Sequence, residues 1–349
     1  MPRLVREHGE ALAAVLAFGV LAMVPTVSDS AYTVRIFGFA AMWALLALGV
    51  NIVVGMSGQF AVCQAAFWGI GAYSSALAAI NWHLPFFVAL VFATLLTAII
   101  GGILGVIVLR LRGHYLAIAT FGFGVIVHQV LVNWIPLTRG PAGLTGIPPP
   151  DPFVFFGTTV LNFPDINSSF YLMLFLLALG VLGSQRLARS RIHLALNAIR
   201  EDEAVAEVAG IPTVWYKLIA FTISAAYGGV AGSWWAHTMM VLSPDTFVFS
   251  QSAMMLIMAV AGGLGSTYGV AIAAAALTLA PEYLRGLADW QLVAYGAILL
   301  GVIVFFPTGL AGAWNHGKAR LLRRHSELTN LEPEASPGER GANEVVVKP

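Results

Sequence analysis

Residues 84–109 read LPFFVALVFATLLTAIIGGILGVIVL, and this stretch decides the fold class. It contains no charged side chain, and it is longer than the roughly 20 apolar residues that cross the hydrocarbon core of a bilayer. In lipid, a helix satisfies all its backbone polar groups within one segment. We therefore predict that residues 84–109 form a transmembrane helix.

The rest of the chain has the same character. Of its 349 residues, 58% are hydrophobic and 10% are charged, and the mean hydropathy is +0.82. Soluble domains are about 45–50% apolar and about 25% charged. The net charge of +1 argues against a general nucleic-acid binder, and the single cysteine, Cys63, excludes a disulfide framework and a cysteine-rich metal site.

About ten segments have the composition of membrane helices, so the sequence predicts an all-α polytopic membrane protein. They are residues 11–27, 33–54, 60–80, 84–109, 114–135, 169–184, 218–242, 248–262, 268–284 and 290–306. Residues 60–80 and 248–284 are rich in glycine and are candidates for broken or re-entrant helices. Residues 11–27 are read as a retained first helix rather than a cleaved signal.

The cationic residues predict the orientation. If the predicted spans cross the membrane one after another, their loops lie alternately on its two sides. Of the 18 Lys and Arg residues, 15 fall on one side, and only Arg35, Arg139 and Arg285 fall on the other. Cytoplasmic loops carry the excess of cations, so both termini and the loop 185–217 are predicted to be cytoplasmic. We expect a membrane domain over residues 1–315, a polar disordered cytoplasmic tail over 316–349, and a turn-rich cap or docking surface over 136–168 on the other side.

The predicted spans hold almost no charge. His114, His128 and His237 are the titratable candidates within them, and a lone histidine is more often a hydrogen-bonded packing residue. Carriers driven by ions commonly use carboxylates inside the membrane, so energy is expected to enter through another protein. The glycines of GAWNHGKA (312–319) and GGLGSTYG (262–269) lack the strand and helix context of nucleotide sites, and no catalytic or metal constellation is evident.

One charged island interrupts the apolar chain, RSRIHLALNAIREDEAVAEVAGIP at residues 189–212. Glu201, Asp202 and Glu203 suit the first turn of a short helix, and Gly210 suits the left-handed residue after its end. Val205 and Val208 would share one face with Ala209. The helix would either lie on lipid or dock into another protein, and its acidic charge favours docking.

Three blocks of sequence resemble the permease subunits of ABC importers for branched-chain amino acids. They are NIVVGMSGQFAVCQAAFWGIGAY (51–73), RGHYLAIATFGFGVIVHQVLVNW (112–134) followed by LTRGPAGLTGIP, and a third block running from ALNAIREDEAVAEVAGI (195–211) to APEYLR (280–285). The resemblance implies the permease fold and a pore-forming subunit in the bacterial inner membrane. It implies as partners a second permease, two cytoplasmic ATPases that use ATP and Mg, and an extracytoplasmic solute-binding protein; this chain itself would be no enzyme and would bind no cofactor, metal or nucleic acid.

The resemblance also implies that a helix over 193–210 couples the permease to the ATPase. The coupling candidates are Ala198, Arg200, Glu201, Asp202, Glu203, Ala204, Glu207 and Gly210. In many ABC importers this region follows E-A-A-x-x-x-G; here the corresponding positions are Ala204, Val205 and Ala206, and the glutamate is absent.

A small zwitterionic substrate needs neutral polar groups along its path. The candidates for such groups are Gln59, Gln64, Ser74, Thr120, Gln129, Thr222 and Ser224. Each of them could equally form a hydrogen bond that holds two helices together. The candidates for gate or packing glycines, by comparison with transporter folds in general, are Gly55, Gly58, Gly69, Gly71, Gly262, Gly263, Gly265 and Gly269.

Three alternatives stay open on the sequence. The first is a sister ABC permease for urea or short amides. The second is an ion-coupled carrier or channel, against which the missing intramembrane carboxylates count. The third, a membrane enzyme, lacks a catalytic cluster.

Overall fold

The computed structural model describes residues 21–27, 30–108, 113–151, 153–155, 158–161 and 165–284, with isolated positions at 19, 111, 293, 296, 297, 300, 301, 309 and 312. The elements of the first half are α2 Val24–Val27, α3 Ala31–Val50, the π-helical turn η1 Asn51–Met56, α4 Gln64–Trp82, α5 Phe86–Val108, α6 His114–Asn133, α7 Ile135–Thr138, the 3-10 turn η2 Gly140–Ala142, β1 Leu144–Thr145, β2 Phe153–Phe155 and β3 Thr158–Leu161. Those of the second half are α8 Ile166–Ala188, α9 Arg191–Glu201, α10 Glu203–Val208, α11 Thr213–Met239, β4 Val241–Leu242, the 3-10 turn η3 Pro244–Phe247, α12 Phe249–Gly262 and α13 Thr267–Tyr283.

The predicted all-α membrane architecture is confirmed. Four described helical segments are long and apolar enough to cross a membrane, namely Ala31–Met56, Phe86–Val108, His114–Asn133 and Ile166–Ala188. Helix α11 has 27 residues but a less apolar composition, and α12 and α13 have only 14 and 17 residues. The predicted spans at 11–27 and 290–306, the tail and the motif at 312–319 lie wholly or mostly outside the described residues.

Helix α11 is the centre of the packing. It contacts α5 and α4 most extensively and also packs on α3. A Cβ atom added at Gly71 of α4 would lie 2.5 Å from the Cα atom of Gly229 in α11, and one added at Gly232 would lie 2.3 Å from the carbonyl oxygen of Trp68. The backbones of α4 and α11 therefore touch, which is the close packing that small residues allow between membrane helices.

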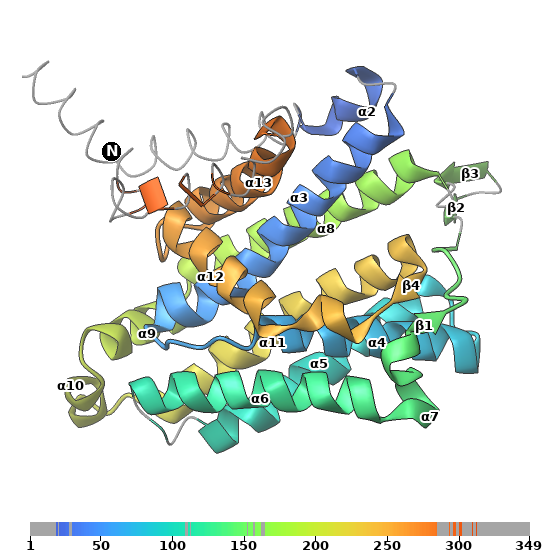
Figure 1. Ribbon diagram of the computed structural model, residues 1–349. Helices are drawn as coiled ribbons and strands as arrows, with labels where there is room; N and C mark the ends of the chain where they lie inside the picture. Colours follow the sequence, from blue (N-terminus) through green and yellow to red (C-terminus); the bar gives the residue numbers. More distant parts are fainter. Residues whose placement is uncertain are drawn as a thin grey trace, which may run out of the picture.

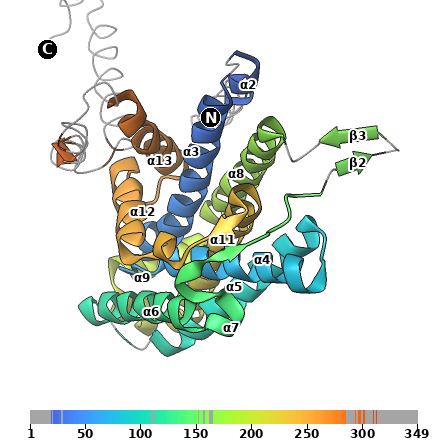
Figure 2. The same cartoon turned by 45° about the vertical axis from the view of Figure 1, so that its right-hand side comes forward.

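The two ends of the bundle differ. Figure 1 shows α9 and α10 at one end and β1 and β4 with α7 at the other, and Figure 2 shows α9 on the opposite side from β2 and β3. At the strand end β1 pairs with β4 in an antiparallel register that aligns Leu144 with Leu242. The region 136–168, predicted to be a turn-rich cap, contains most of α7 together with η2, β1, β2 and β3. The pairing of β1 with β4 fastens this region to the segment that follows α11.

Helices break at two places inside the bundle. Helix α3 runs into η1 and is followed by a non-helical stretch over 58–63, in which Gly58 has φ +70°, before α4 begins at Gln64. Helices α12 and α13 are separated by a tight turn with φ +98° at Gly263 and +90° at Gly265. The α12–α13 turn falls in the glycine-rich segment 248–284 that the sequence marked as a candidate for a broken helix. The first break overlaps the other marked segment, 60–80, only at residues 60–63, and most of it lies before that segment.

Candidate functional site

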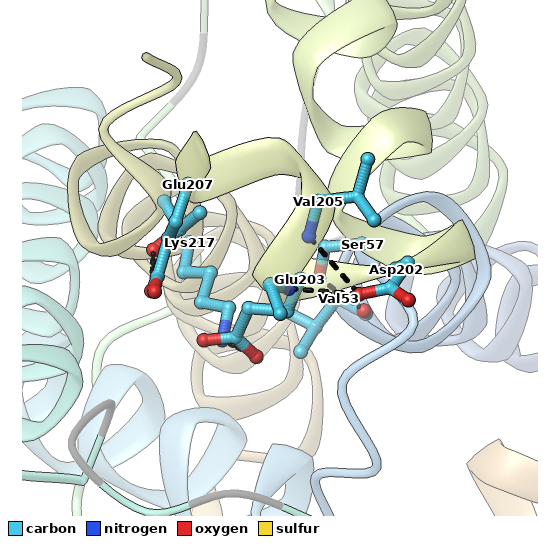
Figure 3. A network of polar contacts seen from close by, with 9 residues as sticks. Val53, Ser57, Asp202, Glu203, Val205, Glu207 and Lys217 are labelled. Carbon is cyan, nitrogen blue, oxygen red and sulfur yellow. Dashed lines mark hydrogen bonds and ion pairs between the residues drawn. The ribbon is translucent and has the colours of Figure 1, made fainter. Parts of the chain in front are cut away.

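The charged island folds as two helices rather than one. The predicted continuous helix over 193–210 is wrong, because Asp202 has extended backbone angles of φ −155° and ψ 112° between α9 and α10. Its carboxylate oxygen Oδ1 accepts hydrogen bonds from the backbone N–H groups of Ala204 at 2.9 Å and Val205 at 3.1 Å (Figure 3). Asp202 is thus the N-cap of α10, while Glu201 ends α9 and is not in the first turn of a helix. We call α9 and α10 together the coupling segment.

The end of the coupling segment follows the sequence prediction. Gly210 has φ +82°, the left-handed conformation expected after a helix end, and Pro212 precedes the first residue of α11. The N–H group of Ile211 donates to the carbonyl oxygen of Ala206 at 3.0 Å, which completes the last turn.

Two glutamates of α10 contact the rest of the chain. Glu203 forms an ion pair with Lys217 of α11, with a distance of 2.6 Å between Oε2 and Nζ (Figure 3). Glu207 accepts a hydrogen bond of 3.0 Å from the hydroxyl of Thr213 at the start of α11. The Lys217 side chain is only 4% exposed, so its ammonium group is enclosed and depends on this carboxylate. These contacts fix α10 on α11.

The opposite face of α10 is apolar and uncovered. The side chains of Val205 and Val208 are 64% and 91% exposed. A groove of about 440 Å³ lies beside α10, lined by Glu207, Ile211, Pro212, Thr213, Val214, Trp215 and Leu218. Glu201, Asp202, Ala204 and Gly210 are also exposed, whereas Ala198 is half-buried within α9.

Arg200 points away from this outer face. Its Nη1 atom donates a hydrogen bond to the carbonyl oxygen of Gly55 in η1, and its stem lies against Gly58. Next to it on α9, burial is the main cause that lowers the pKa of His193 from its ordinary value, and the charge of Arg200 lowers it further. His193 is therefore neutral at pH 7 and binds Asn197 at 3.0 Å.

Four of the path candidates make hydrogen bonds that hold the fold together. The Gln64 side chain of α4 both donates to the carbonyl oxygen of Ser224 in α11 at 3.1 Å and accepts from the Ser224 hydroxyl at 2.9 Å. The Thr120 hydroxyl of α6 accepts from the N–H group of Val62 at 3.1 Å, and the Thr222 hydroxyl donates back to its own helix. In this conformation these side chains form hydrogen bonds within one helix or between two segments.

The other candidates differ. Ser74 is partly buried and donates to the carbonyl oxygen of Gly71, and Gln129 is exposed on α6, where its side chain accepts from Asn133 at 3.0 Å. Gln59 is 5% exposed, and neither polar atom of its side-chain amide has a hydrogen-bond partner. A buried amide without partners is costly, so Gln59 is the candidate whose present surroundings satisfy it least.

The predicted glycines occupy close contacts or turns. Gly69 lies against Phe247, and a Cβ atom at Gly262 would lie 2.4 Å from the Cα atom of Val270. The N–H group of Gly269 donates to the Ser266 hydroxyl at 3.1 Å in the first turn of α13. Gly55, Gly58, Gly263 and Gly265 belong to the two helix breaks, and Gly71 belongs to the contact between α4 and α11.

Sequence reasoning did not single out a buried polar cluster near the strand end. The Ser75 hydroxyl of α4 lies 2.7 Å from that of Ser233 and 3.0 Å from Nε2 of His237, both in α11. Nδ1 of His237 lies 2.7 Å from the carbonyl oxygen of Pro148, so Nδ1 carries the hydrogen and Nε2 accepts. His237 is thus a hydrogen-bonded packing residue. Ser75 and Ser233 resemble other small helix residues in the sequence, so no local signal marks them.

The other two histidines, His128 and His114, are not part of this cluster. Nε2 of His128 is 3.9 Å from a carboxylate oxygen of Asp245, and His114 is exposed at the start of α6. Within the part of the chain that the structure describes, no three His, Cys, Asp or Glu residues lie close enough together to hold a metal ion.

Comparisons with known proteins agree with this arrangement. Residues 32–307 match the family model described as "Branched-chain amino acid transport system / permease component". The high-affinity branched-chain amino acid transport system permease protein LivM of Escherichia coli (strain K12) is 35% identical over 313 residues, covering 85% of this chain and 74% of the relative. LivM of Salmonella typhimurium is 34% identical with the same coverage, and no solved structure matches.

Proposed function

The chain belongs to the family of permease components of branched-chain amino acid transport systems, and from this we propose that it is the membrane-spanning permease subunit of an ATP-driven importer for leucine, isoleucine and valine. The observation that carries the proposal is the family match over residues 32–307, which includes the coupling segment and both helix breaks. A permease component is not itself an enzyme. ATP and Mg are proposed to be used by partner subunits.

The coupling segment supports an ATPase partner. Its exposed valines, Val205 and Val208, project from a helix whose charged side is held on α11. A separate groove, lined by Glu207 and Trp215 among others, lies where α10 meets α11. A short helix with an apolar outer face is suited to a groove in another protein. We propose that α10 seats in a cytoplasmic ABC ATPase, two copies of which serve the transporter together with a second permease and an extracytoplasmic solute-binding protein.

The composition of the membrane helices supports the substrate class. Branched-chain amino acids are small zwitterions with no net charge, and a path for them needs polar but uncharged groups. Exposed Gln129 and orphaned Gln59 are amides of this kind. The excess of cations on the coupling-segment side supports a bacterial inner-membrane location with both termini in the cytoplasm.

Co-purification tests the partner proposal directly. The tagged chain is purified from its native membrane in mild detergent, and its stoichiometric partners are identified by mass spectrometry. We expect a second permease and an ATPase. Recovery of the chain alone would contradict the importer and return the ion-coupled carrier to first place.

A matched pair of variants locates the docking surface. Val208→Asp places a charge on the most exposed valine of α10 and is expected to abolish ATPase recovery while the chain stays folded. Val241→Asp makes the same change at a 53% exposed valine at the strand end and should leave ATPase recovery unchanged. Reversing Glu203 and Glu207 to Arg is a poorer test, because it also removes the contacts that hold α10 on α11.

Uptake into proteoliposomes that contain the purified complex tests the substrate. Labelled leucine should enter only with ATP and the binding protein, and unlabelled isoleucine or valine should compete. Competition by urea but not by isoleucine would assign the same fold to urea or short amides. Uptake that stops with a proton uncoupler at constant ATP would contradict an ATP-driven importer.

A further inference from the structure

Three irregular stretches of the membrane domain converge on one place. They are η1, the non-helical stretch 58–63 and the turn between α12 and α13. The N–H group of Gly265 in that turn donates to Oδ1 of Asn51 in η1 at 2.8 Å. A Cβ atom at Gly55 would lie 2.6 Å from the backbone nitrogen of Gly265, so the two backbones are in direct contact. The two helix breaks are therefore joined by a hydrogen bond and by direct backbone contact.

The coupling segment reaches this structure through one side chain. Arg200 of α9 donates from Nη1 to the carbonyl oxygen of Gly55. A Cβ atom at Gly58 would lie 2.8 Å from Cγ of Arg200, and one at Gly265 would lie 3.6 Å from its Nη1 atom. Arg200 thus bonds to η1, packs against the non-helical stretch and lies close to the α12–α13 turn.

The chemistry of these contacts suits an arginine. The last carbonyl groups of a helical segment have no partner within the helix and carry partial negative charge, so a cationic donor is favourable there. The planar guanidinium group offers several donors in fixed directions. Gly58 has φ +70° and no side chain, which leaves room for the arginine stem to pass.

The same region contains unsatisfied polar groups. Nδ2 of Asn51 and both amide atoms of Gln59 are buried without hydrogen-bond partners. Such groups are rare in a settled interior because each one costs free energy. The stretch 51–59 is therefore less well satisfied here than the regular helices around it, which is the condition expected of a part that rearranges during transport.

We propose that Arg200 is a positioning residue that ties the coupling segment to the two helix breaks, so that displacement of α9 moves Gly55, Gly58 and Gly265 together. This proposal rests on the proposed function, in which an ATPase displaces the coupling segment. It gives Arg200 a role toward the membrane domain in place of the ATPase-facing role that the sequence suggested.

The first experiment measures coupling in the reconstituted transporter. Substrate molecules moved per ATP hydrolysed are determined for the native complex, for Arg200→Met and for Arg200→Lys. Methionine keeps an unbranched apolar stem but cannot donate, and we expect the ratio to fall by about tenfold, the size of a lost hydrogen bond from a charged donor. Lysine retains one cationic donor and should recover part of the ratio. Arg191→Met, at an exposed arginine at the start of the same helix, is the control and should behave as native.

The second experiment needs no partner and uses the purified full-length chain in detergent. Hydrogen exchange is followed at the amides of Gln59 and Gly265, which bond to Val53 and Asn51 respectively. We expect both to exchange faster in Arg200→Met than in Arg191→Met, while amides of α4 beyond its first turns are unchanged. Unchanged exchange at Gln59 and Gly265 would overturn the tie itself.

The two experiments separate the proposals. If the native complex hydrolyses no ATP or imports nothing, the proposed function fails while the exchange result still stands. If native import is intact and Arg200→Met keeps a native ratio of transport to hydrolysis, the inference about Arg200 is wrong and the proposed function is untouched.

Discussion

The ion pair between Glu203 and Lys217 gives an asymmetric prediction. The Lys217 side chain is 4% exposed and that of Glu203 is 24% exposed, with 2.6 Å between Nζ and Oε2. Glu203→Gln leaves the enclosed ammonium group without this carboxylate, whereas Lys217→Met leaves a carboxylate that can still reach water. The first change should therefore destabilise the attachment of α10 more than the second.

The magnitudes follow from the burial. Removing one partner of a buried pair costs about 3–5 kcal/mol, and the partial exposure of Glu203 places Glu203→Gln near the lower end, about 3 kcal/mol. A loss of about 1 kcal/mol is expected for Lys217→Met, the upper end of the range for ion pairs near the surface, because the remaining carboxylate can be hydrated. Converted at 1.4 kcal/mol per factor of ten, these are roughly 150-fold and roughly fivefold changes in a local opening equilibrium.

Hydrogen exchange at Ala206 and Ile211 measures this opening. Their amides bond to the carbonyl oxygens of Asp202 and Ala206, so they report on α10 and its end. The double variant Glu203→Gln with Lys217→Met contains no buried charge at this position and should exchange within about tenfold of the native chain. Glu201→Gln, at an exposed carboxylate, is the control. Equal effects of the two single variants, or a double variant as unstable as Glu203→Gln, would refute the reasoning.

Three further predictions concern single positions. Gly71→Ala should prevent folding or assembly, because its Cβ atom would lie 2.5 Å from the Cα atom of Gly229, whereas Gly122→Ala on the uncovered part of α6 should be recovered at native yield in detergent. Burial lowers the pKa of His193 below 6.5, so the folded chain binds fewer protons at this residue than the unfolded chain does. The stability of α9 should therefore be full above about pH 6.5 and should fall as the pH drops toward the lowered pKa. Hydrogen exchange of α9 at pH 7.5 and 5.5 would show this difference, and His193→Asn should remove it. Gly210→Pro should uncouple ATP hydrolysis from transport more than Gly210→Ala, since φ +82° is closed to proline but costs alanine only about 1 kcal/mol.

Much of the fold follows from the sequence because lipid restricts the backbone. Uncharged runs such as 84–109 and 114–135 appear as α5 and α6 with ends displaced by only a few residues. Individual candidate glycines such as Gly58 and Gly263 indicate the helix breaks, since a residue with positive φ rarely carries a side chain. The π-helical turn at 51–56 was not predicted, and the hydrogen bond from the distant Gly265 to Asn51 at its start has no local signal in the sequence.

The break in the coupling segment has a local signal in the sequence. Ser190 and Asp202 are both favourable N-cap residues, and two N-caps twelve positions apart indicate two helices. Asp202 stands between two glutamates, so its side chain is equally typical of an acidic first turn, and the sequence pattern alone does not distinguish the two roles. The left-handed end at Gly210 was predicted correctly, because glycine followed by a residue and then proline specifies it locally.

The sequence did not allow us to predict which face of α10 packs against the rest of the chain. Glu203 and Glu207 are four residues apart and share one side of α10, with Val205 and Val208 on another, and periodicity shows only that the sides differ. In a soluble helix the valines would be turned inward. Here the first turns of α11 offer Lys217 and Thr213 to the acidic side, so the apolar side is left outward. The side chains of α11, and not the periodicity of α10, therefore determine which face of α10 is buried.

This inverted arrangement fits a part that must transmit movement. An apolar outer face loses little on leaving water, so a partner can bind it without the cost of stripping charges. The charged side chains of Arg200 and Glu203 contact the membrane domain, where a broken helix leaves carbonyl groups without partners inside the helix. Arg200 supplies such a donor to Gly55, and Lys217 holds α10 to the long helix α11. A push on α10 from outside would then reach the bundle at two places, one on a continuous helix and one on the two helix breaks. Because the continuous helix resists bending and the breaks do not, the movement is expected to concentrate in residues 51–63 and 262–266.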